Sequence, residues 1–365
     1  MKKRRNWGLA AALVLPVVLI LLFRVLKEYP AVMDRWVFGF MGPVEQALGR
    51  MLARVRLSVA ELMAAALLVW VCLWLVWTVA QVIRKRAWGR FVCRLLVLLA
   101  VCLWLVAGLD WLWNAAYYAS DFTRRSGLEV QACSVEELRA ATRQFAQRAN
   151  ELSGRVERDA EGHFDLSVRE CLDRGVNAYD GLEKEFPFLA QKSVKAKPLL
   201  CSKIQSLLGF TGIYAPFTGE ANVNVDAPAC LLPATIAHEM AHQRMIAAEE
   251  EANFVGIAAC ITCADVTFQY SGWLMGLIHL SNALYQADPD GWYEIRAEFS
   301  HELITDWNDN NEYWAKLDSG MEEAARQAYD SFLKGNDQTM GIRSYGACVD
   351  LLVTWTGDFQ GKGVA

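Results

Sequence analysis

Residues 235–243 read Thr-Ile-Ala-His-Glu-Met-Ala-His-Gln, which contains the pattern HExxH. Residues four apart on a helix lie on the same face, so His238 and His242 can converge on one metal ion. Glu239 can then reach a water molecule on that metal and act as its general base. The stretch therefore predicts a helix with a catalytic Zn2+ site of the metallopeptidase type, one ion per chain. In the alternative, both histidines are ordinary surface or core residues that point apart and bind no metal.

The amino-terminal third of the chain is strongly apolar. The sequence is 54% hydrophobic with 14 tryptophans, and its apolar residues concentrate before position 115. Three apolar runs, at about 7–26, 58–83 and 92–113, are long enough to cross a bilayer as helices. The first run is too long for the core of a signal peptide, and no small-x-small cleavage site follows it. We therefore predict three retained transmembrane helices in a membrane domain over residues 1–113, in contact with the lipid bilayer.

The distribution of basic residues predicts the topology. The chain begins Met-Lys-Lys-Arg-Arg, and the segment 84–90 between the second and third runs is also basic. Under the positive-inside rule both segments face the cytoplasm, so residues 114–365 form an extracytoplasmic domain. The loop 27–57 weakens this signal because it also carries arginines, at positions 35, 50, 54 and 56.

The loop 27–57 contains an amphipathic helical pattern after Pro43. Apolar residues recur at helical spacing, with Glu45, Gln46, Arg50 and Arg54 on the other side. Two placements are open: the helix lies on the membrane surface, or it packs on the extracytoplasmic domain.

The region 114–365 is long enough for one domain with a sizeable core, and its apolar periodicity is mainly helical. A capping box at Ser134-Val135-Glu136-Glu137 predicts a helix to about Leu152. Residues 165–186 predict a second helix, ended by Pro187, and 192–198 a basic linker. Alternating residues in 210–217 and 221–225 then predict two short strands of a small sheet.

The two predicted strands immediately precede the HExxH helix. In this position an edge strand can hold an extended peptide by main-chain hydrogen bonds across the metal. We therefore expect the substrate, a peptide or protein, to bind along Gly212, Tyr214, Asn222 and Asn224. The alternative is an ordinary hairpin without a role in binding.

A catalytic zinc ion usually has a third protein ligand. Glu249, Glu250 and Glu251 follow the HExxH pattern, but on one continuous helix Glu249 would lie about 10 Å beyond His242. We therefore expect the helix to break between Gln243 and Ala248 and the chain to reverse direction.

The second helix would begin with these glutamates. Its face with Glu249, Ala252, Asn253 and Gly256 has small residues that allow a close approach, which favours Glu249 as the ligand. Glu250 and Glu251 stay open as ligands. The alternative for the three acidic residues is a solvated helix start, which Glu250 alone fits well. Asn253 and Glu251 are candidates for orienting the ligands from outside the coordination sphere.

The segment Glu249 to Asn253, Glu-x-x-Ala-Asn, is similar to the Glu-x-x-Ala-Asp segment of gluzincin-type membrane zinc peptidases. More closely, the chain resembles the bacterial domain-of-unknown-function family 3810 over nearly its whole length. The residues that carry the resemblance lie, besides the three spans, in 113–118, 212–224, the HExxH stretch, 249–254, 329–336 and 341–346. The resemblance implies a membrane-anchored zinc peptidase of the bacterial cell membrane, mainly α, with an α+β zincin-like, gluzincin-type domain and a small sheet. One departure is Met245, where the chain must turn and where we expect a glycine.

Hydrolysis also needs a donor that stabilises negative charge on the substrate oxygen. Arg343 and Tyr345, in a segment that carries the resemblance, are the preferred candidates, and His301 is a third. Each also has a structural interpretation, as an ion-pair partner, a half-buried core residue and a surface cap. His163 and His279 have no metal-spaced partner and are expected to be structural.

The remaining features exclude or leave open other functions. The net charge of −5 and the absence of a glycine-rich phosphate loop give no reason to expect nucleic acid binding. The seven cysteines outside the spans can pair in an oxidising compartment, but their spacing does not define the pairing. A membrane receptor or scaffold, with a closed four-ligand metal site completed by His301 or a second glutamate, is the alternative to a peptidase.

Overall fold

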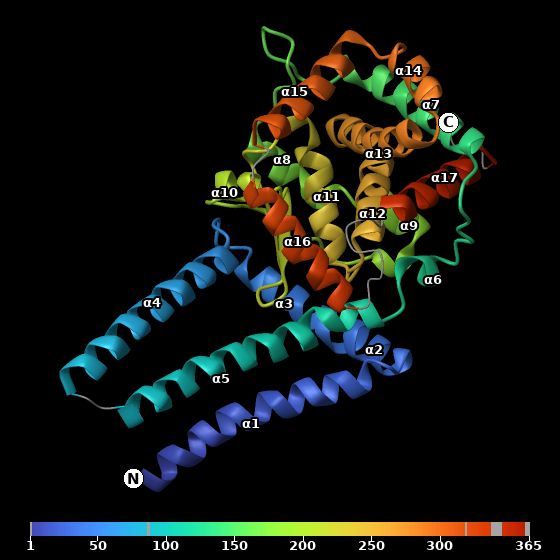
Figure 1. The fold of residues 1–365 in the computed structure, drawn as a ribbon. Coiled ribbons are helices and arrows are strands. Elements are labelled where there is room, and N and C mark those ends of the chain that lie inside the picture. The colour runs from blue at the N-terminus through green and yellow to red at the C-terminus, as the bar shows by residue number, and fades with distance from the viewer. Residues whose placement is uncertain (1, 86–87, 318–319, 337–344, 362–365) are drawn as a thin grey trace.

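A computed structural model describes residues 2–85, 88–317, 320–336 and 345–361. Three long helices, α1 (Lys2–Leu26), α4 (Val59–Lys85) and α5 (Trp88–Leu112), extend from one side of a helical domain (Figure 1). Their segments Trp7–Leu26, Val59–Arg84 and Phe91–Leu112 are long and apolar enough to cross a membrane, at nearly the predicted bounds. The start of α1, the end of α4 and the start of α5 all lie at the end away from the domain (Figure 1).

The segment between α1 and α4 lies against the domain. It contains α2 (Pro30–Trp36), a π-helical stretch (Val37–Met41) and α3 (Gly42–Leu52). On α3, Glu45 and Gly49 are buried, whereas Val44 and Met51 are exposed. A Cβ atom added to Gly49 would lie 2.6 Å from the Gly219 carbonyl oxygen, so the two chains touch there. The helix therefore packs on the domain with part of its polar side and turns apolar residues outward.

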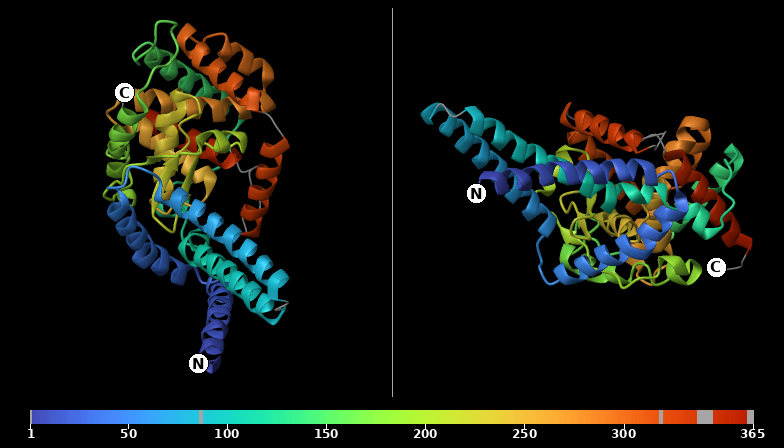
Figure 2. Two further views of the ribbon diagram at one scale, coloured as in Figure 1. Left: turned by 90° about the vertical axis from the view of Figure 1, so that its left-hand side faces the viewer. Right: turned by 90° about the horizontal axis from the view of Figure 1, so that it is seen from below.

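The centre of the domain is a stack of α11 (Leu232–His242), α12 (Glu249–Thr262) and α13 (Val266–Ala287). The helix α7 (Val135–Ser153) packs on α13, and α17 (Tyr345–Gly361) packs on α12. The left view in Figure 2 also shows the three long helices gathered on one side of this stack. The other α-helices are α6 (Phe122–Ser126), α8 (Val168–Arg174), α9 (Leu182–Glu185), α10 (Ser202–Leu207), α14 (Pro289–Arg296), α15 (His301–Leu317) and α16 (Gly320–Gly335).

The capping box predicted at Ser134 is present, and it opens α7 as expected. The single helix predicted over 165–186 is wrong, because α8 and α9 occupy only its two ends. The segment between them wraps closely around the central helices. A Cβ atom added to Gly175 would lie 2.8 Å from Ile236 Cγ2, and one added to Gly181 would collide with the Thr262 carbonyl. Contacts with distant residues thus override the local helical pattern.

The small sheet has the order β1-β3-β2. The predicted hairpin is confirmed as β2 (Gly212–Ala215) paired antiparallel with β3 (Glu220–Val223). The third strand, β1 (Lys197–Pro198), lies in the expected linker and pairs parallel with β3. The Lys197 ammonium group forms a buried ion pair with Glu220 and donates to the Leu52 and Leu57 carbonyls. These bonds tie the sheet to the connection between α3 and α4. β2 stands at the end of the strand order and is therefore an edge strand.

Besides the main apolar core of the domain, a second apolar cluster joins the long helices α1 and α5 to the domain. It spans the predicted boundary at residues 113 and 114, so the two parts share one core. Its buried members are Phe23, Met33, Val37, Met41, Ala115, Ala116, Tyr214, Met245 and Ala247.

Candidate metal centre

The HExxH helix α11 ends at His242, and α12 begins at Glu249 after the expected reversal. Met245 lies within this turn with φ 62°, the left-handed conformation for which the sequence led us to expect glycine. Its side chain is only 6% exposed and belongs to the shared cluster, so packing holds a conformation that costs a residue with a Cβ atom some strain. The next residue back, Arg244, is also buried and pairs with Glu183 at 2.9 Å.

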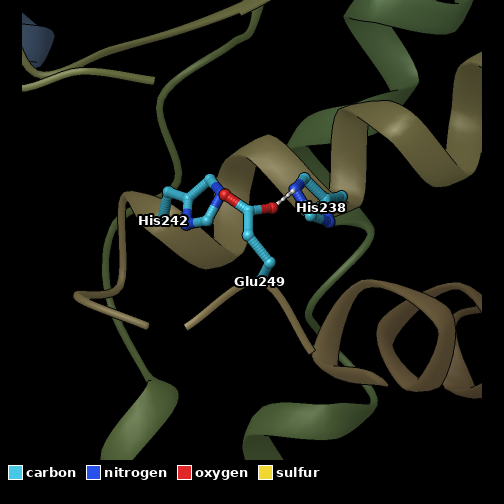
Figure 3. A group of neighbouring side chains, drawn as sticks. All are labelled: His238, His242 and Glu249. Atoms are coloured by element: carbon cyan, nitrogen blue, oxygen red, sulfur yellow. Dashed lines mark ion pairs between the residues drawn. The ribbon is translucent and has the colours of Figure 1, made fainter. Parts of the chain in front are cut away.

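The turn brings α12 back along α11 at very short range. A Cβ atom added to Gly256 would lie 2.8 Å from the backbone nitrogen of His238. This close approach places Glu249 opposite both histidines. Figure 3 shows the two imidazole rings of α11 turned toward the Glu249 carboxylate between them.

The three side chains form one cluster of potential ligands. His238 Nε2 lies 3.4 Å from Glu249 Oε2, and His242 Nε2 lies 3.8 Å from Glu249 Oε1. All three ligand atoms lie within 4.8 Å of one another. Of the three glutamates that the sequence left open, the structure brings Glu249 to the histidines.

This cluster fits a zinc ion. Ligands bound at about 2.0–2.2 Å in a tetrahedral site lie roughly 3.3–3.6 Å apart, so small adjustments of the observed separations suffice. His242 Nδ1 lies 2.7 Å from the Ile246 carbonyl oxygen, which fixes the proton on Nδ1 and leaves the Nε2 lone pair free for a metal. Two imidazoles and one carboxylate are a donor set of catalytic zinc sites.

The electrostatics of the cluster favour ligand-competent forms of two residues. Burial lowers the pKa of His242 to about 4, so its imidazole is neutral at pH 7. Burial raises the pKa of Glu249, but the hydrogen bond from His238 and the nearby histidine charges outweigh it and bring the value to about 2. For His238, the interactions with Glu249 and Glu239 outweigh burial and raise the pKa, and a hydrogen bond with Asn253 adds to this effect. Asn253 therefore lies beside a potential ligand, where the sequence placed it.

Glu239 lies next to the cluster and is almost fully buried. Burial raises its pKa to about 8, which His238 opposes and Glu249 reinforces. Its Oε2 atom has no hydrogen-bond partner within the described part of the chain. A Cβ atom added to Gly212 would collide with this carboxylate, so β2 begins directly against Glu239.

Three residues expected to act in or around the site have other roles. The Glu251 carboxylate does not orient a ligand but accepts hydrogen bonds from the Phe122 and Thr123 backbone, at 2.8 and 3.0 Å. Asn222 and Asn224 are buried and bond to the hairpin and its surroundings, at the Ile213 and Phe210 carbonyls among others, so a substrate cannot reach their side chains. They lie on or next to the inner strand β3, where polar side chains replace missing backbone partners.

The remaining residues that the sequence predicted for the site lie in several different parts of the chain. Tyr214 is buried, with its ring centroid 6.5 Å from that of His242 and its hydroxyl donating to Glu45. Arg343 lies outside the described residues, and Tyr345 begins α17 with a side chain that is also outside them. His301 is exposed at the start of α15, which packs on α7.

Sequence reasoning missed Tyr329 and Tyr117. The Tyr329 hydroxyl, on α16, donates a hydrogen bond to Glu249 Oε1. The buried Tyr117 hydroxyl is close enough for the charge of Glu249 to add to the effect of burial in raising its pKa. No short-range spacing connects either tyrosine with the HExxH helix, although both lie in segments that carry the family resemblance.

The structure also shows the surroundings of the remaining histidines and of the cysteines. His279, expected to be structural, has a pKa lowered to about 4 by burial and by the charge of His238, so it lies near the cluster. His163 pairs with Asp309 at the surface. All ten cysteines are free, so none of the possible disulfides forms in this structure.

Fold and site together define a mainly helical protein with three helices of membrane-spanning length and a His-His-Glu cluster. The family described as "Protein of unknown function (DUF3810)" matches residues 38–353. The match covers most of the chain, which therefore belongs to this family. No curated protein matches the chain, and no solved structure matches it.

Proposed function

We propose that the protein is a membrane-anchored zinc metallopeptidase of the gluzincin type. The observation that supports this most strongly is the convergence of His238, His242 and Glu249 beside the buried carboxylate of Glu239. The proposed domain layout places the zincin-like domain outside the cytoplasm of a bacterial cell. The start of α1, the end of α4 and the start of α5, which carry basic residues, lie together away from the domain, and this supports that orientation (Figure 1).

In this function a bound Zn2+ supplies Lewis-acid activation of a water molecule and of the substrate carbonyl. Glu239 accepts the proton of the attacking water and then delivers it to the leaving amine. Burial raises the pKa of Glu239 to about 8. A nearby cation would lower this pKa and so favour the carboxylate form that accepts the proton. The bond between the carbonyl carbon and the amide nitrogen breaks, and one water molecule is consumed.

Tyr329 is our candidate for the donor to the substrate oxygen. Its hydroxyl reaches Glu249, and the charge of Glu239 also contributes to raising its pKa, so it lies near both residues. A neutral hydroxyl at this place can donate a hydrogen bond to the charge that develops on the substrate. The backbone of β2, from Gly212 onward, offers an edge along which an extended peptide can pair.

The alternative function, a membrane receptor or scaffold with a structural metal, requires a closed site. Among the described residues, the group whose potential ligand atoms lie within 4.8 Å of one another consists of His238, His242 and Glu249. A three-ligand site leaves a position for water, which favours catalysis.

The decisive variant is Glu239→Gln, which keeps the shape of the side chain but cannot accept the proton. We expect wild type and variant, purified in detergent, each to bind about one zinc ion per chain. We expect hydrolysis of a broad peptide library to fall by about 100- to 10,000-fold in the variant. Equal cleavage by both proteins would refute the assigned role of Glu239, and a lack of zinc in both would refute the peptidase.

A further inference from the structure

The metal-ligand cluster lies directly against the end of a membrane span. The helix α5 ends at Leu112, and the next residue, Trp113, contacts His242 edge-on with ring centroids 5.3 Å apart. Since His242 is one of the potential zinc ligands, no linker separates the span from the site. The site therefore lies at the boundary between the bilayer and the domain.

The hairpin of β2 and β3 continues from the site into the region of the spans. β2 begins against Glu239 at Gly212, and the chain then leads to Phe217 in the turn. The Phe217 ring touches α5, because a Cβ atom added to Gly108 would lie 2.6 Å from it. Gly108 lies within the apolar span Phe91–Leu112. The edge strand thus leads from the candidate general base toward the spans over about 10 Å, at roughly 3.3 Å per residue, and Phe217 follows two residues later in the turn.

An apolar groove lies where the hairpin meets the spans. It has a volume of about 500 Å³ between α1 and α5, and Leu9, Val101, Trp104 and Phe217 are among its lining residues. Phe217 therefore belongs both to the groove and to the turn that follows the edge strand. The groove and the edge strand thus adjoin each other at Phe217.

We propose that the substrate is a membrane-tethered polypeptide whose own transmembrane helix packs against α1 and α5 and places side chains in the groove between them. The extended chain next to that helix pairs with the edge of β2 and presents its peptide bond to Glu239. This inference rests on the proposed peptidase function and specifies its substrate class. A lipid acyl chain would fill the same groove, but it would make no use of the edge strand that leads to the site.

The test compares one peptide sequence in three forms, in vesicles that contain the full-length protein. In two forms a single transmembrane helix is fused to the peptide, and either about five or about thirty residues separate the two. Each of these two forms is made twice, once with the helix before the peptide and once with the helix after it. The third form is untethered. We expect the form with the short spacing to be cleaved at least about tenfold faster than the others, because Phe217 at the groove follows Gly212 beside Glu239 by five positions in the chain.

Matched variants test the groove itself. Val101→Trp fills the groove, whereas Val106→Trp introduces the same residue on an exposed part of α5 that does not line it. We expect Val101→Trp to reduce cleavage of the short-spaced substrate about tenfold and to leave the untethered peptide unaffected. We expect Val106→Trp to change neither.

A readout without hydrolysis separates this inference from the proposed function. A photo-crosslinker replaces Val101 or Val106 in the Glu239→Gln protein, and the short-spaced substrate is added. Crosslinks from position 101 to the substrate helix, and not from position 106, support the docking whether or not the protein proves to be a peptidase. Crosslinks from position 101 to lipid alone would overturn it, as would equal cleavage of tethered and untethered forms, which leaves the peptidase itself intact.

Discussion

Tyr329 is the residue whose role separates catalysis most clearly from metal binding. Its hydroxyl donates to Glu249, and Tyr329→Phe removes this hydroxyl while it keeps the ring that packs on Phe210. We expect kcat for peptide hydrolysis to fall by about 100-fold with little change in KM, because the lost donor acts on the transition state. Zinc content is expected to stay near that of wild type.

The matched control is Tyr313→Phe. The Tyr313 hydroxyl bonds to Ser206 and Asp226, at 2.6 and 2.8 Å, and is not part of the cluster. We expect normal turnover in this variant. If Tyr329→Phe instead lost zinc and kept turnover per bound zinc, the hydroxyl would only position Glu249.

Glu45 predicts a pH dependence of stability. Burial raises its pKa from the ordinary 4.5 to about 8, against the opposing effect of its hydrogen bond with Tyr214. A carboxyl group whose pKa is higher in the folded state stabilises the fold fully below pH 4.5 and loses that effect as the pH rises toward 8. Glu45→Gln, which stays neutral, should therefore unfold at nearly the wild-type temperature at pH 5 and at a clearly higher temperature at pH 8. A difference that does not change with pH would contradict the buried state of Glu45.

Particular residues show which features of the site could be predicted from the sequence and which could not. His238, Glu239 and His242 were identifiable because their relation is local, within one turn of a helix. Met245 was recognised as the turning point, but its left-handed conformation depends on packing with residues from the membrane part. Asn222 looked available for binding in an alternating strand. Its burial depends on β1, a strand of two residues that no pattern of its own reveals.

At the scale of elements, the close approach of α12 to α11 determines the geometry of the cluster. Gly256→Ala would introduce a Cβ atom 2.8 Å from the His238 nitrogen, so the helices must move apart. We expect zinc affinity to fall by about tenfold or more and stability by about 1–3 kcal/mol, measured by zinc titration and thermal unfolding. The helix propensity of alanine, worth about 1 kcal/mol, offsets part of this cost.

Gly357→Ala is the matched control, because a Cβ atom added at this helical position meets nothing within 4 Å. We expect unchanged zinc affinity and equal or slightly higher stability. Equal behaviour of both alanine variants would mean that the spacing of α11 and α12 does not control the site.

A helix or strand could be predicted when the pattern that determines it lies within its own residues. The spans follow from continuous apolar length, and α7 follows from its capping box. The segment 165–186 failed because its glycines contact Ile236 and Thr262, which lie far along the chain. For α3, the amphipathic pattern was visible, but which side packs on the domain depends on the partner of Glu45.

At the scale of the whole molecule, the membrane part and the domain depend on each other. Tyr214, Met245 and Ala247 are buried partly against residues of the first 113 positions. The isolated fragment 114–365 would expose this cluster and leave Lys197 without the Leu52 and Leu57 carbonyls. We expect it to aggregate or to unfold at least about 10 °C below the full chain, since several kcal/mol of burial are lost. Unfolding at the full-chain temperature with normal zinc binding would show that the domain is independent.

The contact between Trp113 and His242 has a mechanical consequence. No spacer follows Leu112, so we expect a tilt of α5 to reach the proposed metal ligand His242 through Trp113. Helices respond to a bilayer of unsuitable thickness by tilting, at a cost of fractions of a kcal/mol per Å of mismatch. We therefore expect vesicles with shorter or longer acyl chains to shift the zinc affinity of the cluster with no change in the protein.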